Sequence, residues 1–195
     1  RFFDRKEVRD MIAYLSVINN PEDEIRLRRI VNTPRRGIGD KTVDTASQIA
    51  QQVGESLFTV LTHPRDFPAI SRAANKLEPF VAMLQEFMEK NQQEALSPSE
   101  LYGALLERLA YEDFLKEDEP EKAEDRIENV RELSSMLQRY EEEAGEEASL
   151  SGFLEEVSLF TDIDNYDAGA DSVVLMTIHS AKGLEFPVVF LPGWE

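Results

Sequence analysis

The chain has 195 residues, with 21 lysines and arginines against 39 aspartates and glutamates, so its formal net charge is −18. This charge argues against a protein that coats nucleic acid with its whole surface, because such a surface would repel phosphates. With no cysteine and two histidines, disulfide frameworks, thiol nucleophiles, zinc fingers, iron–sulfur sites and multi-histidine metal sites are excluded. The apolar runs are too short to span a membrane and the start lacks a signal-peptide pattern, so we expect a piece of a larger cytoplasmic protein.

Charge is unevenly distributed along the chain. Residues 112–147 contain 15 acidic and 5 basic side chains, which is typical of solvated helix faces. Residues 26–41 contain six basic side chains and a single acidic one, Asp40. This second segment can form one basic contact patch on an otherwise acidic body, and nucleic acid is a ligand that such a patch would attract.

Periodic apolar residues predict helices in the first fifty residues. The first helix follows Asp4-Arg-Lys-Glu7, which has the form of a capping box, and it stops at Asn19-Asn20-Pro21. A second helix carries apolar residues from Ile25 to Val31 and ends before Thr33-Pro34, because a residue that precedes proline disfavours helical angles. A tight turn follows, and Asp40 is placed to cap a third helix.

The middle of the chain has the pattern of further helices. We expect them over residues 71–91, from Ser97 to about 109, over 121–142 and over 150–160. The second of these begins with Ser97-Pro98-Ser-Glu100, a cap, a proline at the first helical position and a glutamate that closes a capping box. The helix over 121–142 has an apolar face formed by Ile127, Val130, Leu133, Leu137 and Tyr140.

The pattern changes towards the end of the chain. Residues 162–171 are polar and loop-like, and their aspartates lack the spacing of a calcium-binding loop, so no metal site is expected. Residues 173–178 and 186–191 are short runs rich in β-branched residues, which predict buried strands. The simplest arrangement is a helical domain inserted into an α/β domain, of which the chain contains the flanks.

The turn between the second and third helices is a candidate binding site. It does not fit a P-loop, because Asp40 separates the glycine from the lysine. Two glycines permit a sharp turn and a close approach of the backbone to another molecule, and the following helix start can bind a phosphate. Such contacts hold a nucleic-acid backbone without reading its sequence. The alternative is an ordinary corner between helices with solvated arginines. The candidate residues are Arg35, Arg36, Gly37, Ile38, Gly39, Lys41 and Thr42.

Three blocks of sequence resemble the UvrD/Rep/PcrA-type superfamily 1 DNA helicases. Residues 177–186 resemble motif V of that family, and the similarity continues to Glu195. Residues 2–7, with Ala13-Tyr-Leu, resemble the segment after motif IV. Residues 29–39 resemble the start of the inserted subdomain called 2B, and a helical region of fitting length separates this block from the motif V block.

The resemblance implies a fold. Members of the family have two RecA-like lobes, each with a helical insertion, and they bind ATP between the lobes and single-stranded DNA across them. The chain would then be mostly α. Residues 32–170 would form the helical 2B insertion, residues 1–31 would lead into it from the second RecA-like lobe, 2A, and residues 171–195 would return to 2A with motif V.

The resemblance also implies roles for individual residues. His179 would face single-stranded DNA, with Thr177 and Ser180 as neighbours that share the contact. Glu185 would contact the nucleotide ribose, with Gly183 beside it in the nucleotide-binding loop. The turn formed by Gly37, Ile38 and Gly39 would correspond to the element that holds duplex DNA ahead of the fork.

By this resemblance the chain is part of a bacterial, DNA-associated, ATP-dependent 3′-to-5′ DNA helicase. ATP and Mg²⁺ would belong to the full-length protein, and we expect the chain alone to be inactive, because the Walker A, Walker B and motif VI regions are absent from it. Two alternatives stay open. One is a related helicase–nuclease, and the other is an acidic helical module that docks a protein partner.

Overall fold

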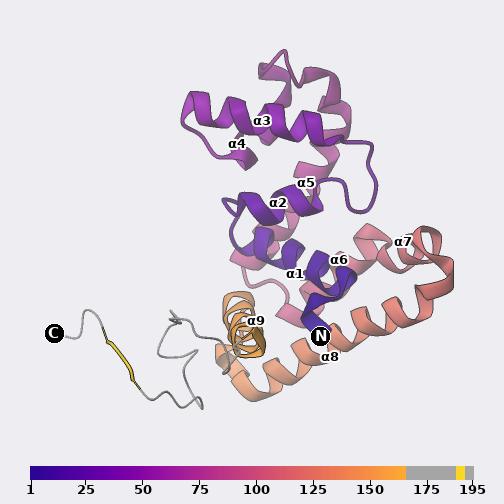
Figure 1. Ribbon diagram of the computed structural model, residues 1–195, viewed down its shortest axis with the longest axis vertical. Coiled ribbons are helices and arrows are strands. Elements are labelled where there is room, and N and C mark those ends of the chain that lie inside the picture. Colours follow the sequence, from indigo (N-terminus) through magenta and orange to yellow (C-terminus); the bar gives the residue numbers. More distant parts are fainter. Residues whose placement is uncertain (166–187, 192–195) are drawn as a thin grey trace. The chain divides into compact units, whose positions relative to one another are not determined.

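The computed structural model describes residues 1–165 and 188–191, and the side chains of residues 1–160 and 188–191 (Figure 1). The chain divides into two compact units, residues 1–154 and 155–195. The described helices are α1 (Lys6–Asn19), α2 (Glu24–Ile30), α3 (Asp40–Val53), α4 (Leu57–Thr62), α5 (Ala74–Gln92), α6 (Pro98–Leu109), α7 (Tyr111–Asp118), α8 (Ala123–Ala144) and α9 (Leu150–Asn165), with single 3₁₀ turns between some of them. The prediction of a mostly α chain is confirmed.

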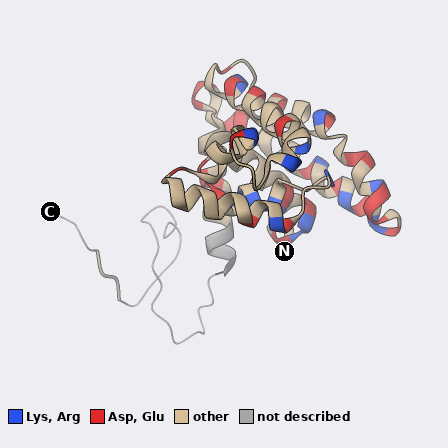
Figure 2. Ribbon diagram, turned by 90° about the horizontal axis from the view of Figure 1, so that it is seen from above, with Lys and Arg blue, Asp and Glu red and all other residues tan. Residues whose placement is uncertain are grey.

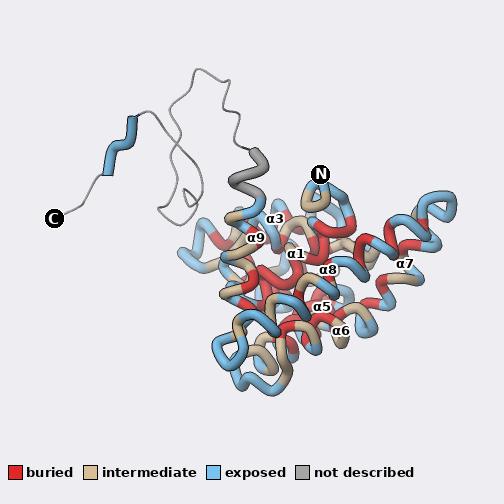
Figure 3. Tube along the Cα trace, turned by 90° about the horizontal axis from the view of Figure 1, so that it is seen from below, coloured by how far each residue is buried: buried red, intermediate tan, exposed pale blue. Residues whose placement is uncertain are grey.

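Helix α1 lies in the core of the first unit. It packs against α2, α5 and α8, and its residues Val8, Met11, Tyr14 and Leu15 are fully buried. Figure 3 shows the buried residues along α1 and along the inward sides of the helices around it. The sequence predicts that residues 1–31 flank the helical region, yet the described contacts place α1 inside the helical unit. The assignment of residues to lobes stays a prediction.

The start of α1 differs from the expected capping box. The helix begins at Lys6 after Arg5, and no side chain caps it. The Glu7 side chain is buried, where it accepts a hydrogen bond from Asn129 at 2.6 Å and pairs with Arg126 at 3.3 Å. A buried carboxylate requires charged or donating partners, and these partners on α8 outweigh a local cap. The capping box at residues 4–7 was therefore a wrong prediction.

Two further details of the first helices differ from the sequence prediction. Ile25 is 83% exposed and does not belong to the apolar face of α2, which buries Leu27 and Ile30. Asp40 does not cap α3, because Gly39 is the capping residue and Asp40 is the first helical residue. Asp40 nevertheless places a negative charge in the first turn, where the helix dipole favours it.

Other local predictions are confirmed. Ser97 and Glu100 form the predicted capping box of α6, and the predicted face of α8 is buried except for Tyr140, which is half-buried. The short helices α4 and α7 were not predicted, because six and eight residues carry too little periodicity. The predicted strand over 173–178 lies outside the described residues. Of the strand over 186–191, residues 188–191 are described and are exposed without strand structure, since a strand needs a paired neighbour.

Candidate nucleic-acid interface

The turn between α2 and α3 is organised by the side chain of Asn32. Its Oδ1 atom accepts hydrogen bonds from the backbone N–H groups of Arg36 at 2.8 Å and of Ile38 at 3.1 Å. Ile38 is buried, whereas Gly37 and Gly39 on either side of it are exposed. The turn is thus fixed to the core by one apolar side chain, and it presents the backbone of two glycines to solvent.

The two glycines have different conformations. Gly37 has a φ of +70°, and a Cβ atom added to it would lie 2.9 Å from the Nζ atom of Lys76. Gly39 has a φ of −81°, and a Cβ atom added there would meet nothing within 4 Å among the described residues. Only Gly37 therefore needs to be glycine for conformational reasons.

Arg36 is directed into the protein. Its Nη1 atom donates to the carbonyl oxygens of Ile30 and Pro34, each at 3.1 Å, and its Nη2 atom donates to the Tyr14 hydroxyl at 2.6 Å. Its guanidinium also lies over the Phe80 ring, 4.8 Å from the centroid. The Arg36 side chain therefore binds the protein itself, although the sequence alone makes it a candidate contact to DNA.

Most other cations of residues 26–41 face carboxylates. The pairs are Arg26 with Asp23, Arg28 with Glu24 and Asp44, and Arg29 with Asp10. Asp10 is buried, and this burial raises its pKa even though Arg29 and Tyr111 bind it. In the described part of the chain, no carboxylate lies within ion-pair distance of Arg35 or Lys41, and both are exposed. Of the six cations in residues 26–41, Arg35 and Lys41 are therefore the two that are exposed and have no ion-pair partner among the described residues.

Lys76 adds a cation that sequence reasoning missed. It lies on α5, and its Nζ atom donates to the carbonyl oxygen of Gly37 at 2.8 Å. Its exposed ammonium stands at the tip of the turn although 39 residues separate the two in sequence. Nothing in the local pattern around Lys76 identifies it, because only the packing of α5 brings it to this place.

Comparison with known proteins gives the family. The whole chain, residues 1–195, matches the family described as the UvrD-like helicase C-terminal domain. The chain belongs to this family. It is 39% identical over 202 residues to the ATP-dependent DNA helicase PcrA of Bacillus subtilis, and 41% and 38% identical over 197 residues to proteins of the same name from Staphylococcus epidermidis and Staphylococcus aureus. These matches cover 100% of the chain and 26 or 27% of each relative, so the chain spans about a quarter of their length.

A groove lies beside the turn of this UvrD-like C-terminal domain. It has a volume of about 370 Å³, and its lining includes Pro34, Arg36, Lys76, Phe80 and Arg108. Among the described residues, its lining contains three cations and no carboxylate. Arg36 already donates to carbonyl groups of the protein and Arg108 lies 3.9 Å from Glu86, so the groove by itself does not indicate an anion site.

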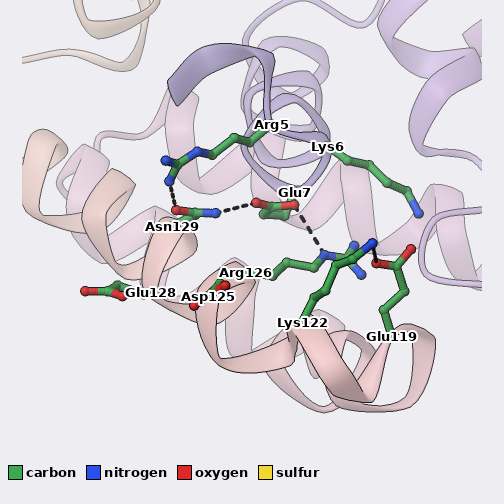
Figure 4. A pocket seen from close by; sticks show the side chains of 9 residues that line it. All are labelled: Arg5, Lys6, Glu7, Glu119, Lys122, Asp125, Arg126, Glu128 and Asn129. Atoms are coloured by element: carbon green, nitrogen blue, oxygen red, sulfur yellow. Dashed lines mark hydrogen bonds and ion pairs between the residues drawn. The ribbon is translucent and has the colours of Figure 1, made fainter. Parts of the chain in front are cut away.

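A second, larger cleft lies where the start of α1 meets α8 (Figure 4). Its volume is about 630 Å³, and four cations and four carboxylates line it. The Asn129 side chain accepts a hydrogen bond from Arg5 and donates one to Glu7, and Glu7 in turn pairs with Arg126. The four positive and four negative charges of the lining balance one another, so the cleft does not favour a charged ligand. Its contacts link α1 to α8.

The residues that the resemblance assigns to motif V lie outside the described residues. These are Thr177, His179, Ser180, Gly183 and Glu185. Within the described part, no helix is long and apolar enough to cross a membrane, and no group of three or more potential metal ligands gathers. Figure 2 shows acidic and basic residues interspersed over the described helices.

Proposed function

We propose that this chain holds duplex DNA through the turn at residues 34–39, as part of an ATP-dependent 3′-to-5′ DNA helicase. The observation that supports the proposal is that two cations at the turn have no carboxylate partner among the described residues. Arg35 and Lys41 are exposed and form no ion pair with a carboxylate among the described residues, and they lie next to the exposed backbone of Gly37 and Gly39. The names of the relatives, which are ATP-dependent DNA helicases, support the helicase part.

The contacts would be made to phosphates. The start of α3 offers backbone N–H groups and the positive end of the helix dipole, and Thr42 in its first turn adds a hydroxyl group. Arg35, Lys41 and Lys76 would supply three positive charges around this helix start, against the one negative charge of Asp40 in its first turn. Contacts of this kind fix a duplex in place without reading its bases. Ile38 and Arg36 contribute by holding the turn in shape.

The remaining contacts rest on the resemblance alone. In the full-length protein, Thr177, His179 and Ser180 would bind single-stranded DNA, and Gly183 and Glu185 would bind the nucleotide. ATP and Mg²⁺ would be held mainly by parts of the protein that these 195 residues do not contain. The full-length protein would act on DNA in the bacterial cytoplasm, and this chain alone would neither bind nor hydrolyse ATP measurably.

The duplex contact can be tested by titrating a labelled duplex with the chain at several salt concentrations. The net charge of −18 should restrict binding to a Kd of about 10⁻⁴ M or weaker at physiological salt. Three neutralised phosphates give a slope of log K against log [salt] of about −3. Replacing both Arg35 and Lys41 by alanine should reduce this slope to about −1.

The matched control removes the same charge elsewhere. Lys116 and Lys122 are exposed, and each pairs with a carboxylate three residues away. Their double alanine variant should bind duplex with the slope of the unchanged chain. If both double variants bind alike, the turn is only a corner between helices. The acidic module that docks a protein partner, which the exposed carboxylates of residues 112–147 favour, then becomes the better proposal.

The nucleotide contact needs the full-length protein. Replacing Glu185 by alanine should raise the KM for ATP more than it lowers kcat, because a ribose hydrogen bond acts in both the ground state and the transition state. The expected cost is about 0.5–1.5 kcal/mol, the usual net value of one hydrogen bond. Steady-state ATPase kinetics measure it, and a loss of kcat at unchanged KM would assign Glu185 to the chemistry or to lobe coupling instead.

A further inference from the structure

Two adjacent arginines in the turn have opposite surroundings. Arg35 is exposed and has no ion-pair partner among the described residues. Arg36 is half-buried, and its guanidinium donates to three main-chain carbonyl groups and to one hydroxyl group. A guanidinium engaged in this way has few N–H groups left for a phosphate, since it has five in total.

We propose that Arg36, together with Tyr14, positions the duplex-binding turn and does not itself bind DNA. The proposal rests on the proposed function of the turn and names the residues that give it its shape. The carbonyl groups that Arg36 binds belong to Ile30, Val31 and Pro34. These residues extend from the last residue of α2 to the first residue of the turn, so the planar guanidinium fixes the path of the chain over this stretch.

Tyr14 connects this arrangement to the core. It lies on α1, is fully buried, and donates a hydrogen bond from its hydroxyl to the carbonyl oxygen of Thr33 at 2.6 Å. The same hydroxyl accepts the hydrogen bond from Arg36 at 2.6 Å. Burial raises the pKa of Tyr14 to about 12, so the hydroxyl keeps its proton and its donor role at physiological pH. A core helix thereby determines where the turn lies.

Phe80 and Asn32 complete the support. The Phe80 ring on α5 lies under the Arg36 guanidinium, which is a favourable contact between a cation and an aromatic face. Asn32 holds the backbone N–H groups of Arg36 and Ile38. The turn is therefore supported from α1 and α5, and the positions of its exposed glycines depend on groups that no ligand touches.

The first experiment compares two charge-conserving substitutions at adjacent positions. Arg35→Lys keeps the charge that a phosphate contact needs, so duplex affinity should change by less than about twofold. Arg36→Lys keeps the charge but loses the planar guanidinium, so affinity should fall about threefold to tenfold, the loss expected for one or two hydrogen bonds. Equal affinities of the two variants would overturn the proposal for Arg36.

The second experiment compares two buried tyrosines that each donate to a carbonyl group. Tyr14→Phe removes the hydroxyl under the turn, and Tyr102→Phe removes one that donates to Val130 at 2.9 Å on α8. Both variants should lose similar stability in urea denaturation. At a temperature where both are folded, only Tyr14→Phe should weaken duplex binding, by about threefold. Its salt slope should stay that of the unchanged chain, because no phosphate contact is removed.

Hydrogen exchange gives a readout that needs no DNA. In Tyr14→Phe the amide protons of Arg36 and Ile38 should lose protection, whereas Tyr102→Phe should keep it. Retained protection together with unchanged affinity in Tyr14→Phe would overturn the positioning role. If the unchanged chain fails to bind duplex at all, the proposed function fails, and the exchange of these two amides still decides whether Tyr14 holds the turn.

Discussion

Cations gather at the turn of residues 34–39 and also in the cleft between α1 and α8, but their partners in the two regions differ. In the cleft, Lys122 and Arg126 contact carboxylates of Glu119 and Glu7. At the turn, Arg36 binds neutral carbonyl groups, and Arg35 lies near no carboxylate in the described part of the chain. In the described part of the chain, the positive charge of Arg35 at the turn is therefore not offset by an ion pair.

This difference shows what a basic sequence segment can and cannot indicate. Six basic residues among residues 26–41 favour an anion site, yet three of them are neutralised by nearby carboxylates. An ion pair within the protein reduces the potential that a phosphate would meet. What identifies a candidate site is the set of cations without internal partners, together with exposed backbone donors beside them.

The largest expected effect is in the cleft. Replacing Arg126 by methionine should destabilise the chain by about 3–5 kcal/mol, because Glu7 would remain buried without its cation. Urea denaturation measures this loss. Where the variant is still folded, duplex binding should be unchanged, since the cleft is separate from the turn. Weaker duplex binding by the folded variant would contradict the division of roles between the two regions.

A double variant tests the cause of that loss. Removing both charges, with Glu7→Leu in addition to Arg126→Met, should restore part of the stability, since no unpaired charge then remains buried. As a surface control, Arg131→Ala removes an exposed cation that pairs with Glu112, and no measurable change in stability is expected. A double variant that is less stable than Arg126→Met alone would show that Glu7 is held by Asn129 without help from Arg126.

The next largest effect is a difference in stability between substitutions at the two glycines of the turn. Gly37→Ser should cost about 1 kcal/mol or more, because a side chain disfavours positive φ and meets Lys76. Gly39→Ser should leave stability unchanged or slightly increased, since serine suits an N-cap position with extended backbone. Thermal denaturation of the two variants gives the comparison. Equal losses at both positions would mean that exposure, and not backbone conformation, selects glycine here.

The smallest effect concerns acid pH and the cleft. A hydrogen bond from Arg126 holds the pKa of Asp118 below its usual value of 3.8. The folded state therefore gains stability from the charged Asp118 above about pH 5, and this gain is lost as the pH falls through 3.8 towards the lower folded pKa. Asp118→Asn should thus lose less stability between neutral and acid pH than the unchanged chain. Urea midpoints at both pH values measure the difference, and parallel pH profiles would contradict it.

The sequence predicted those features of the fold that depend on residues close together in the chain. The apolar spacing predicted α5, α6, α8 and α9 within a few residues, because each helix buries one face at the helical period. The capping box of α6 was predicted because all of its parts lie within four residues. The same pattern at residues 4–7 led to a wrong prediction, because the Glu7 side chain binds Arg126 and Asn129 on α8.

The sequence by itself determined the helical class, the family and the location of an exposed glycine turn. These properties depend on local spacing and on short strings of residues in a fixed order. Tertiary structure alone decided that Arg36 supports the turn, that Tyr14 lies beneath it, and that Lys76 reaches Gly37. The partners in these contacts are up to 39 residues apart, and only the packing of α1 and α5 brings them within hydrogen-bond distance.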